Sequence, residues 1–235
     1  MRVALISCVE RAVSGLAGVL RMLGHEPVGA LTIALGASRY GADTAGAITR
    51  RAGDGFDVVV AGSPSRIASL LAALDADAAI SAAFPTLIPA DALDVPPFGI
   101  VNTHPSLLPR YRGPNPIAWT VRNGDRELGY SVHRMDADFD TGPLLAQDTT
   151  PIDDVEDPSE LFERMFGLLG SLLADALARV EKRDPGDPQP DRQATYAGFF
   201  EPEYVEIDWS QTAPKCVGRC CPGALPRRAP GHAVR

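Results

Sequence analysis

The stretch of this sequence with the clearest chemical potential is "VNTHPSLLPRYRGPNP", residues 101–116, in which Asn102 and His104 are separated by a single residue. An amide can donate a hydrogen bond to a developing oxyanion, and an imidazole can take up or release a proton near neutral pH. Asp140, in the later stretch "MDADFDTGP", adds a carboxylate that could orient the imidazole and stabilise its charge. Asn102, His104 and Asp140 together predict acyl transfer to an amine, with these three as the catalytic residues.

The signature motifs of several other enzyme classes are absent from the sequence. There is no "GxSxG" pattern, so a covalent acyl-enzyme is not expected. Neither "GxGxxG" after the first apolar run nor "GxxxxGK[ST]" occurs, which removes the main support for binding a dinucleotide or for a P-loop. His133 falls inside a strand pattern, and we interpret it as structural.

Charge and composition restrict the partners that the sequence predicts. A formal net charge of -8 argues against a nucleic-acid partner, because phosphate binding relies on clustered lysine and arginine. No apolar run approaches the roughly 20 residues of a membrane span, so we expect a cytoplasmic protein without a membrane partner. Cys216, Cys220 and Cys221 crowd together, but only His232 is near them as a further ligand, so no metal site is expected.

Alternating strand and helix patterns must position the three polar residues. β-branched and aliphatic runs predict strands in "RVALIS", "PVGALTIA", "DVVVAG", "DAAISAAF" and "FGIVNTH", and helical spacing occupies the intervals before the second and fourth of them. This alternation predicts an α/β fold with an open, mostly parallel, Rossmann-like sheet covered on both faces. Ligands of such sheets bind outside the carboxyl ends of the strands, where Asn102 and His104 are expected to lie.

The sequence of the second half of the chain predicts a few more helices and strands and then changes in composition. A short helix in "NPIAWTVRNG", strands in "LGYSVHRMD" and "GPLLAQDTTPI", and a long amphipathic helix from residue 157 to 183 complete a catalytic domain of residues 1–183. Residues 184–210 form a Pro-rich connector and a β-hairpin-like extension, and residues 211–235 a disordered tail. The aromatic stretch "ATYAGFFEPEYVEIDW" either packs on the main domain or forms a homodimer contact.

"VNTHPSLLPRYRGPNPIAW" and "GDRELGYSVHRMDADFDTGPLL" closely resemble the signature of the folate-dependent formyltransferases, a family that includes methionyl-tRNA, glycinamide ribonucleotide and sugar N-formyltransferases. The resemblance implies the formyltransferase fold and N10-formyltetrahydrofolate as formyl donor. It also implies that Asn102, His104 and Asp140 are the catalytic triad. In this interpretation, Asn102 and His104 stabilise the tetrahedral oxyanion while Asp140 holds the tautomer of His104.

The same resemblance implies where the folate binds. Its pterin would lie against the loop "AAFPTLIP" and against "MDADFD", although ordinary core packing of the first loop is compatible with this. The residues implied are Phe84, Pro85, Leu87, Ile88, Ala137 and Asp138.

Within the family, the sequence resembles the sugar enzymes best. The similarity lies in the "FP…IP" loop, in "RYRGPNP" and in the short appendage, whereas the transfer-RNA enzyme carries a second domain and fewer than thirty residues follow Trp209 here. We therefore expect a nucleotide-linked amino sugar as acceptor, dTDP-4-amino-4,6-dideoxyglucose or a close relative. Arg110, Tyr111 and Arg112 would contact its phosphates or its sugar.

Other functions remain open alternatives. A methionyl-tRNA or glycinamide ribonucleotide formyltransferase would use the same triad, and a water nucleophile would turn the triad into a formyltetrahydrofolate hydrolase. The chain could instead be an inactive folate-binding remnant. That alternative is motivated by "PKCVGRCCPGALPRRAPGHAVR", which we hypothesise to reflect an altered reading frame.

Overall fold

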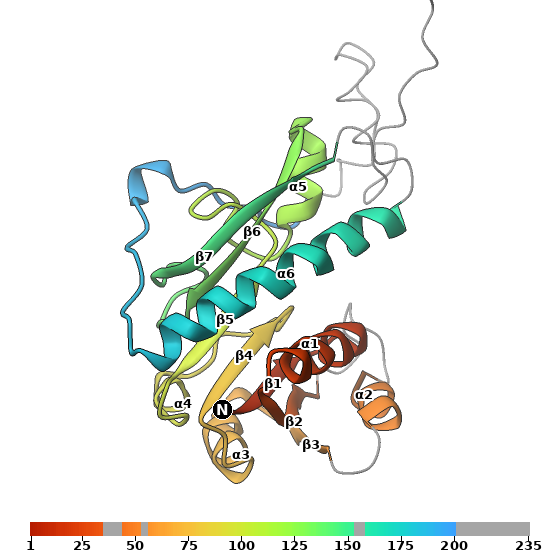
Figure 1. The fold of residues 1–235 in the computed structure, drawn as a ribbon, viewed down its shortest axis with the longest axis vertical. Coiled ribbons are helices and arrows are strands. Elements are labelled where there is room, and N and C mark those ends of the chain that lie inside the picture. Colours follow the sequence, from red (N-terminus) through yellow and green to blue (C-terminus); the bar gives the residue numbers. More distant parts are fainter. Residues whose placement is uncertain (35–43, 53–55, 153–157, 201–235) are drawn as a thin grey trace, which may run out of the picture.

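The computed structural model describes residues 1–34, 44–52, 56–152 and 158–200. They form one seven-stranded sheet with helices on both faces (Figure 1). The strands are ordered β3-β2-β1-β4-β5-β6-β7. The first five strands run parallel, β6 is antiparallel to β5, and β7 is antiparallel to β6. The α/β fold with a mostly parallel, Rossmann-like sheet that the sequence predicted is therefore confirmed.

The elements follow the predicted alternation closely. The strands are β1 (Arg2–Ser7), β2 (Glu26–Ile33), β3 (Asp57–Ala61), β4 (Ala78–Ala82), β5 (Ile100–His104), β6 (Glu127–Arg134) and β7 (Leu144–Pro151). The helices are α1 (Glu10–Met22), α2 (Thr44–Ala52), α3 (Ile67–Ala73), α4 (Ala90–Leu93), α5 (Pro116–Asn123) and α6 (Pro158–Glu181), with 3-10 turns at Pro64–Arg66 and Asp191–Gln193.

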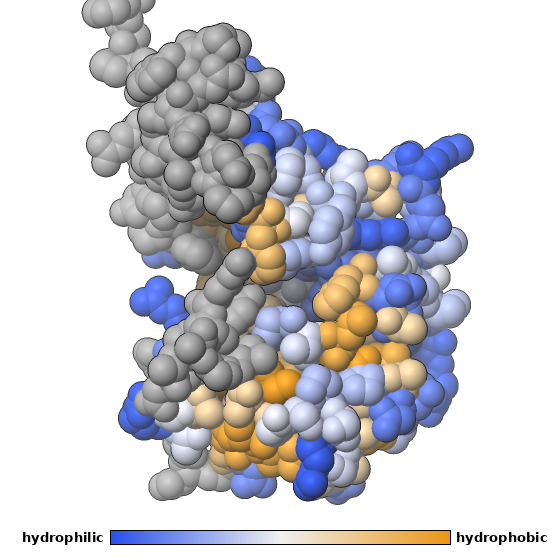
Figure 2. All heavy atoms as spheres, turned by 180° about the vertical axis from the view of Figure 1, so that it is seen from behind, coloured by the Kyte–Doolittle hydropathy of each residue, from blue (hydrophilic) through white to orange (hydrophobic). Residues whose placement is uncertain are grey.

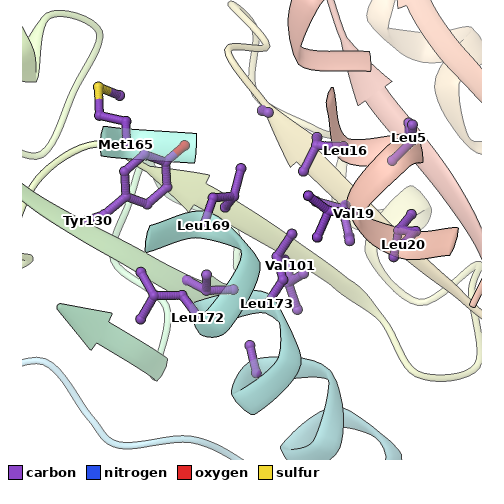
Figure 3. Close-up of a cluster of buried hydrophobic side chains, with 14 of the residues drawn as sticks. Leu5, Leu16, Val19, Leu20, Val101, Tyr130, Met165, Leu169, Leu172 and Leu173 are labelled. Carbon is purple, nitrogen blue, oxygen red and sulfur yellow. The ribbon is translucent and has the colours of Figure 1, made fainter. Parts of the chain in front are cut away.

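Side-chain alternation along the strands divides the core between the two faces of the sheet. Val3 and Leu5 of β1 face one cluster, and Ala4 and Ile6 face the other. Helices α1 and α6 cover the first face, where their leucines lie on either side of Val101 (Figure 3). Helices α3 and α4 cover the second face. Because Val101 faces α1 and α6, Ile100 and Asn102, which flank it in β5, present their side chains to the opposite face.

Residues 184–200, which we call the return segment, run back from the end of α6 towards α5 (Figure 1). An antiparallel bridge joins Asp187 to Leu144, and a parallel bridge joins Tyr196 to Arg112. Up to residue 200, the return segment thus pairs with the start of β7 and with the loop after β5. The hairpin predicted in residues 194–209 lies only partly within the described residues, where Tyr196 forms an isolated bridge, and the predicted disordered tail lies outside them.

The long helix α6 provides a direct test of the core. Leu173 is fully buried between α6 and the sheet, so Leu173→Ala should lower the free energy of unfolding by about 3 kcal/mol. Ser171→Ala, on the exposed face of the same helix, should change it by less than about 0.5 kcal/mol. Chemical denaturation followed by circular dichroism measures both. Equal stabilities of the two variants would contradict the assigned packing of α6.

Candidate active site

The pairing of β5 with β6 places a second imidazole beside Asn102. His133 is the cross-strand partner of Asn102, and its Nε2 lies 3.2 Å from the side-chain nitrogen of Asn102. The Nδ1 of His133 donates to the carbonyl of Arg134 at 2.8 Å, because a carbonyl can only accept. The contact between Nε2 of His133 and the Asn102 amide holds that amide in place.

His104, at the end of β5, has an orientation that fixes its tautomer. Its side chain is almost fully buried, and its Nε2 lies 2.8 Å from the carbonyl oxygen of Tyr111. Since that carbonyl can only accept, Nε2 carries a proton. The other ring nitrogen, Nδ1, lies 3.5 Å from Oδ1 of Asp140. Nδ1 is therefore the atom of His104 that can gain or lose a proton.

Asp140 lies in the loop after β6 and completes the cluster. Its Oδ1 accepts a hydrogen bond from the Asn102 amide at 3.2 Å, and its Oδ2 accepts one from the backbone N–H of Gly113 at 2.8 Å. Gly113 has a φ of 105°, and a Cβ there would lie 2.6 Å from the ring of Tyr196. Glycine is thus required where the loop after β5 approaches the carboxylate.

Burial and neighbouring groups determine the charges of the cluster. Burial lowers the pKa of His104 below its ordinary value, and the opposing effects of the Asp140 charge and the Tyr111 carbonyl do not cancel it. Burial by itself would raise the pKa of Asp140, but His133, His104 and the Gly113 N–H together lower it. Near neutral pH, the cluster therefore consists of an ionised Asp140 and a neutral His104 with a lone pair at Nδ1.

The structure brings Asn102, His104 and Asp140 together, and it adds His133, which sequence reasoning interpreted as only structural. His133 is fully buried in β6, as that interpretation expected. Its Nε2 nevertheless lies 3.6 Å from Oδ1 of Asp140. The signal that could have identified it was the pairing of β6 with β5, since cross-strand neighbours share a face of the sheet.

The residues proposed for folate contact occupy different environments. Ile88 is buried and Phe84 packs against the cluster beneath α3 and α4, so both contribute to the core. Leu87, Ala137 and Asp138 are exposed, and Pro85 is partly buried. Their roles towards folate stay predictions.

The three residues proposed for the acceptor make contacts within the protein. Arg110 binds Asp125 and the hydroxyl of Tyr111, and that hydroxyl also donates to Asp125. Arg112 binds Gln189 and Asp191. The buried Tyr111 contacts His104 through its carbonyl, and the roles of these three residues towards an acceptor stay predictions.

Two further observations concern the described residues only. No group of three or more His, Cys, Asp or Glu among them could hold a metal ion. Within the same ranges, no helix is long and apolar enough to cross a membrane. The cysteines at positions 216, 220 and 221 lie outside these ranges.

An amide, a neutral imidazole and a carboxylate at a strand end of a Rossmann-like sheet form an arrangement suited to acyl transfer. The chain belongs to the formyl transferase family, because the family's sequence model matches residues 59–177, about half of its length. Members of this family use N10-formyltetrahydrofolate as formyl donor, which confirms at the family level the co-substrate predicted from the sequence.

The curated relatives are methionyl-tRNA formyltransferases. The enzyme of Pelobacter propionicus is 44% identical over 132 residues, which are 56% of this chain and 41% of that protein. The enzyme of Syntrophus aciditrophicus is 38% identical over 64% of this chain and 48% of its own length. The chain thus spans less than half the length of these two relatives.

Solved structures support the fold. HypX from Aquifex aeolicus in complex with tetrahydrofolic acid has a TM-score of 0.70 and 20% identity, covering 95% of this chain and 34% of that chain. A sugar N-formyltransferase from Shewanella sp. has a TM-score of 0.68 and 18% identity, covering 93% of this chain and 87% of that chain. At these identities the likeness shows the fold alone.

These relatives correct the predicted acceptor. The prediction of a nucleotide-linked amino sugar was wrong, because relatives 37–44% identical are methionyl-tRNA formyltransferases. The expectation of no nucleic-acid partner loses its support for the same reason. It rested on net charge, which sums over the whole chain and does not describe any one surface, and on the number of residues after Trp209.

The electrostatics of the site can be tested without substrate. Asp140→Asn removes the negative charge that raises the pKa of His104, so the pKa of His104 should fall further below its ordinary value. NMR titration of histidine rings labelled with carbon-13 measures this, with the His104 signal assigned by its loss in His104→Asn. Glu181→Gln, at the end of α6, serves as the charge-matched control. A His104 pKa that does not respond to Asp140→Asn would contradict the arrangement.

Proposed function

We propose that this chain transfers the formyl group of N10-formyltetrahydrofolate to the amino group of methionyl-tRNA. The observation that carries the proposal is the fixed orientation of His104, whose Nε2 donates to Tyr111 and whose Nδ1 faces the Asp140 carboxylate. The acceptor is proposed from the names of the relatives, which share 37–44% identity over the matched region. The chain covers under half of the length of those proteins.

His104 acts as the proton acceptor of the reaction. The acceptor amine bonds to the formyl carbon, and His104 takes the amine proton at Nδ1. Asp140, 3.5 Å away, stabilises the imidazolium that results. As the bond between the formyl carbon and N10 breaks, His104 returns the proton to N10. The products are formylmethionyl-tRNA and tetrahydrofolate.

Asn102 supplies the hydrogen-bond donor for the oxyanion. Its amide nitrogen donates to Oδ1 of Asp140 at 3.2 Å and lies 3.2 Å from Nε2 of His133. A formyl oxygen that accepts a hydrogen bond from this amide would be stabilised as negative charge develops on it. One such donor is worth about 3 kcal/mol of transition-state stabilisation.

Exposed apolar side chains near the site support a place for the folate. Leu87, Leu107 and Phe139 are exposed, and they belong to the loops that follow β4, β5 and β6. Figure 2 shows the face turned away from the viewer in Figure 1, on which apolar areas alternate with hydrophilic ones. Ligand sites are lined mainly by apolar side chains, with a few polar groups that fix the orientation of the ligand.

The proposed function is tested by a transfer assay with the purified full chain. The assay contains N10-formyltetrahydrofolate and methionyl-tRNA, and mass spectrometry of the released aminoacyl group detects formylmethionine. Wild type should produce it, and His104→Asn should reduce the rate at least a hundredfold, because the proton acceptor is lost. Circular dichroism of His104→Asn should match that of wild type.

Two controls make the result specific. His25→Asn removes a histidine that lies near the N-terminus, away from the cluster, and should leave the rate unchanged. Free methionine as acceptor shows whether the tRNA portion is needed. Formate released without formylmethionine would indicate hydrolysis instead of transfer, and an unchanged rate in His104→Asn would eliminate the assigned role.

A further inference from the structure

The return segment contacts the candidate site at several points, although it is distant from the site in sequence. Near its start, Asp187 pairs with Leu144 at the beginning of β7. Near its end, the Thr195 hydroxyl accepts from the N–H of Tyr111, and the N–H of Ala197 donates to the carbonyl of Arg112. Gln189 lies between these anchors. The return segment therefore borders both loops that build the site.

The side chain of Gln189 joins the two loops directly. Its Oε1 accepts hydrogen bonds from Nε and Nη2 of Arg112, at 3.1 and 2.9 Å. Its Nε2 donates to the carbonyls of Asp140 and Gly142, at 2.9 and 2.7 Å. A primary amide has two donor hydrogens and two acceptor lone pairs. All four take part in hydrogen bonds within the protein.

The loop around Asp140 has a conformation that needs such support. Asp140 has a φ of 56°, in the left-handed region that non-glycine residues seldom occupy. The backbone carbonyls of Asp140 and Gly142 are the groups that Gln189 holds. The Asp140 side chain starts from this backbone and reaches the Gly113 N–H, Asn102 and His104. Displacing the backbone would move the carboxylate away from His104.

We propose that Gln189 is a positioning residue of the site, which holds the Asp140 carboxylate against His104 by tying the 140–142 loop to Arg112. Its consequence for catalysis rests on the proposed function, but its consequence for the geometry does not. Only an amide of this length has donors for the two carbonyls and an acceptor for the guanidinium. Asparagine is one methylene too short, and methionine has the length without the hydrogen-bonding groups.

The experiment uses Gln189→Met and Gln189→Asn in the full chain. The titratable groups facing His104 are Asp140 and His133, and of these Asp140 raises the pKa of His104. A displaced carboxylate should therefore move the carbon-13 NMR titration of His104 to lower pH, towards the position observed in Asp140→Asn. Gln193→Met, on the exposed 3-10 turn of the same segment, is the matched control and should titrate as wild type.

A second readout is the pH dependence of formyl transfer from N10-formyltetrahydrofolate to methionyl-tRNA. In Gln189→Met, kcat should fall at least tenfold, KM for methionyl-tRNA should change less than twofold, and the acidic limb of the kcat profile should move to lower pH. Loss of folded protein alone would lower the amount of active enzyme without moving that limb. If Gln189→Met does not fold, Gln189→Asn, which keeps the amide group but is shorter, provides the same test of the pH profile.

The outcomes separate this inference from the proposed function. Wild-type protein without transfer activity would contradict the proposed function, while the NMR titration would still decide the role of Gln189. Active wild type combined with Gln189 variants that keep both the His104 titration and the kcat profile would overturn the inference. A shift in Gln193→Met equal to that in Gln189→Met would overturn it too, because the effect would then belong to the segment and not to the amide.

Discussion

The hydrogen bond from His104 Nε2 to the carbonyl of Tyr111 is the interaction on which the site depends. It leaves Nδ1 as the atom free to exchange a proton, and it turns that atom towards Asp140. A ring flipped by 180° would turn the carbon Cε1 towards the carbonyl and would leave the Nε2 donor buried without that acceptor, at a cost of about 1–3 kcal/mol. The chemistry of the cluster is thus determined by one backbone carbonyl in the loop after β5.

That carbonyl is held in place by contacts from several parts of the chain. Tyr111 has a φ of 59°, and its hydroxyl accepts from Asn123 and donates to Asp125, which fixes the residue from its side chain. The N–H of the same residue donates to Thr195 of the return segment. The loop therefore depends on both the end of α5 and residues more than eighty positions later, so the return segment is a structural part of the site.

Sequence alone predicted the parts of this arrangement that follow from local patterns. The strands were predictable because buried parallel strands appear as short aliphatic runs. Asn102, His104 and Asp140 were predicted from their residue types and positions, and the resemblance implied the same three residues. His133 was interpreted as structural because strand patterns do not show which residue lies opposite in the next strand. The role of Gln189 was harder to predict than that of His133, because a polar residue among prolines usually indicates a linker. Both depend on register and on long-range contacts, which the sequence does not display.

The acceptor was predicted wrongly for a related reason. The proposed reaction at His104 uses a primary amine and a formyl donor, and nothing in the geometry of the cluster distinguishes an amino sugar from an aminoacyl group. Specificity for the acceptor must arise from surfaces around the cluster, where a few contacts can outweigh the sign of the net charge. Arg110 and Arg112, which the sequence predicted to contact the acceptor, bind Asp125, Gln189 and Asp191 within the protein. An arginine-rich loop beside a catalytic strand can therefore hold the site together, and its arginines alone do not identify the acceptor.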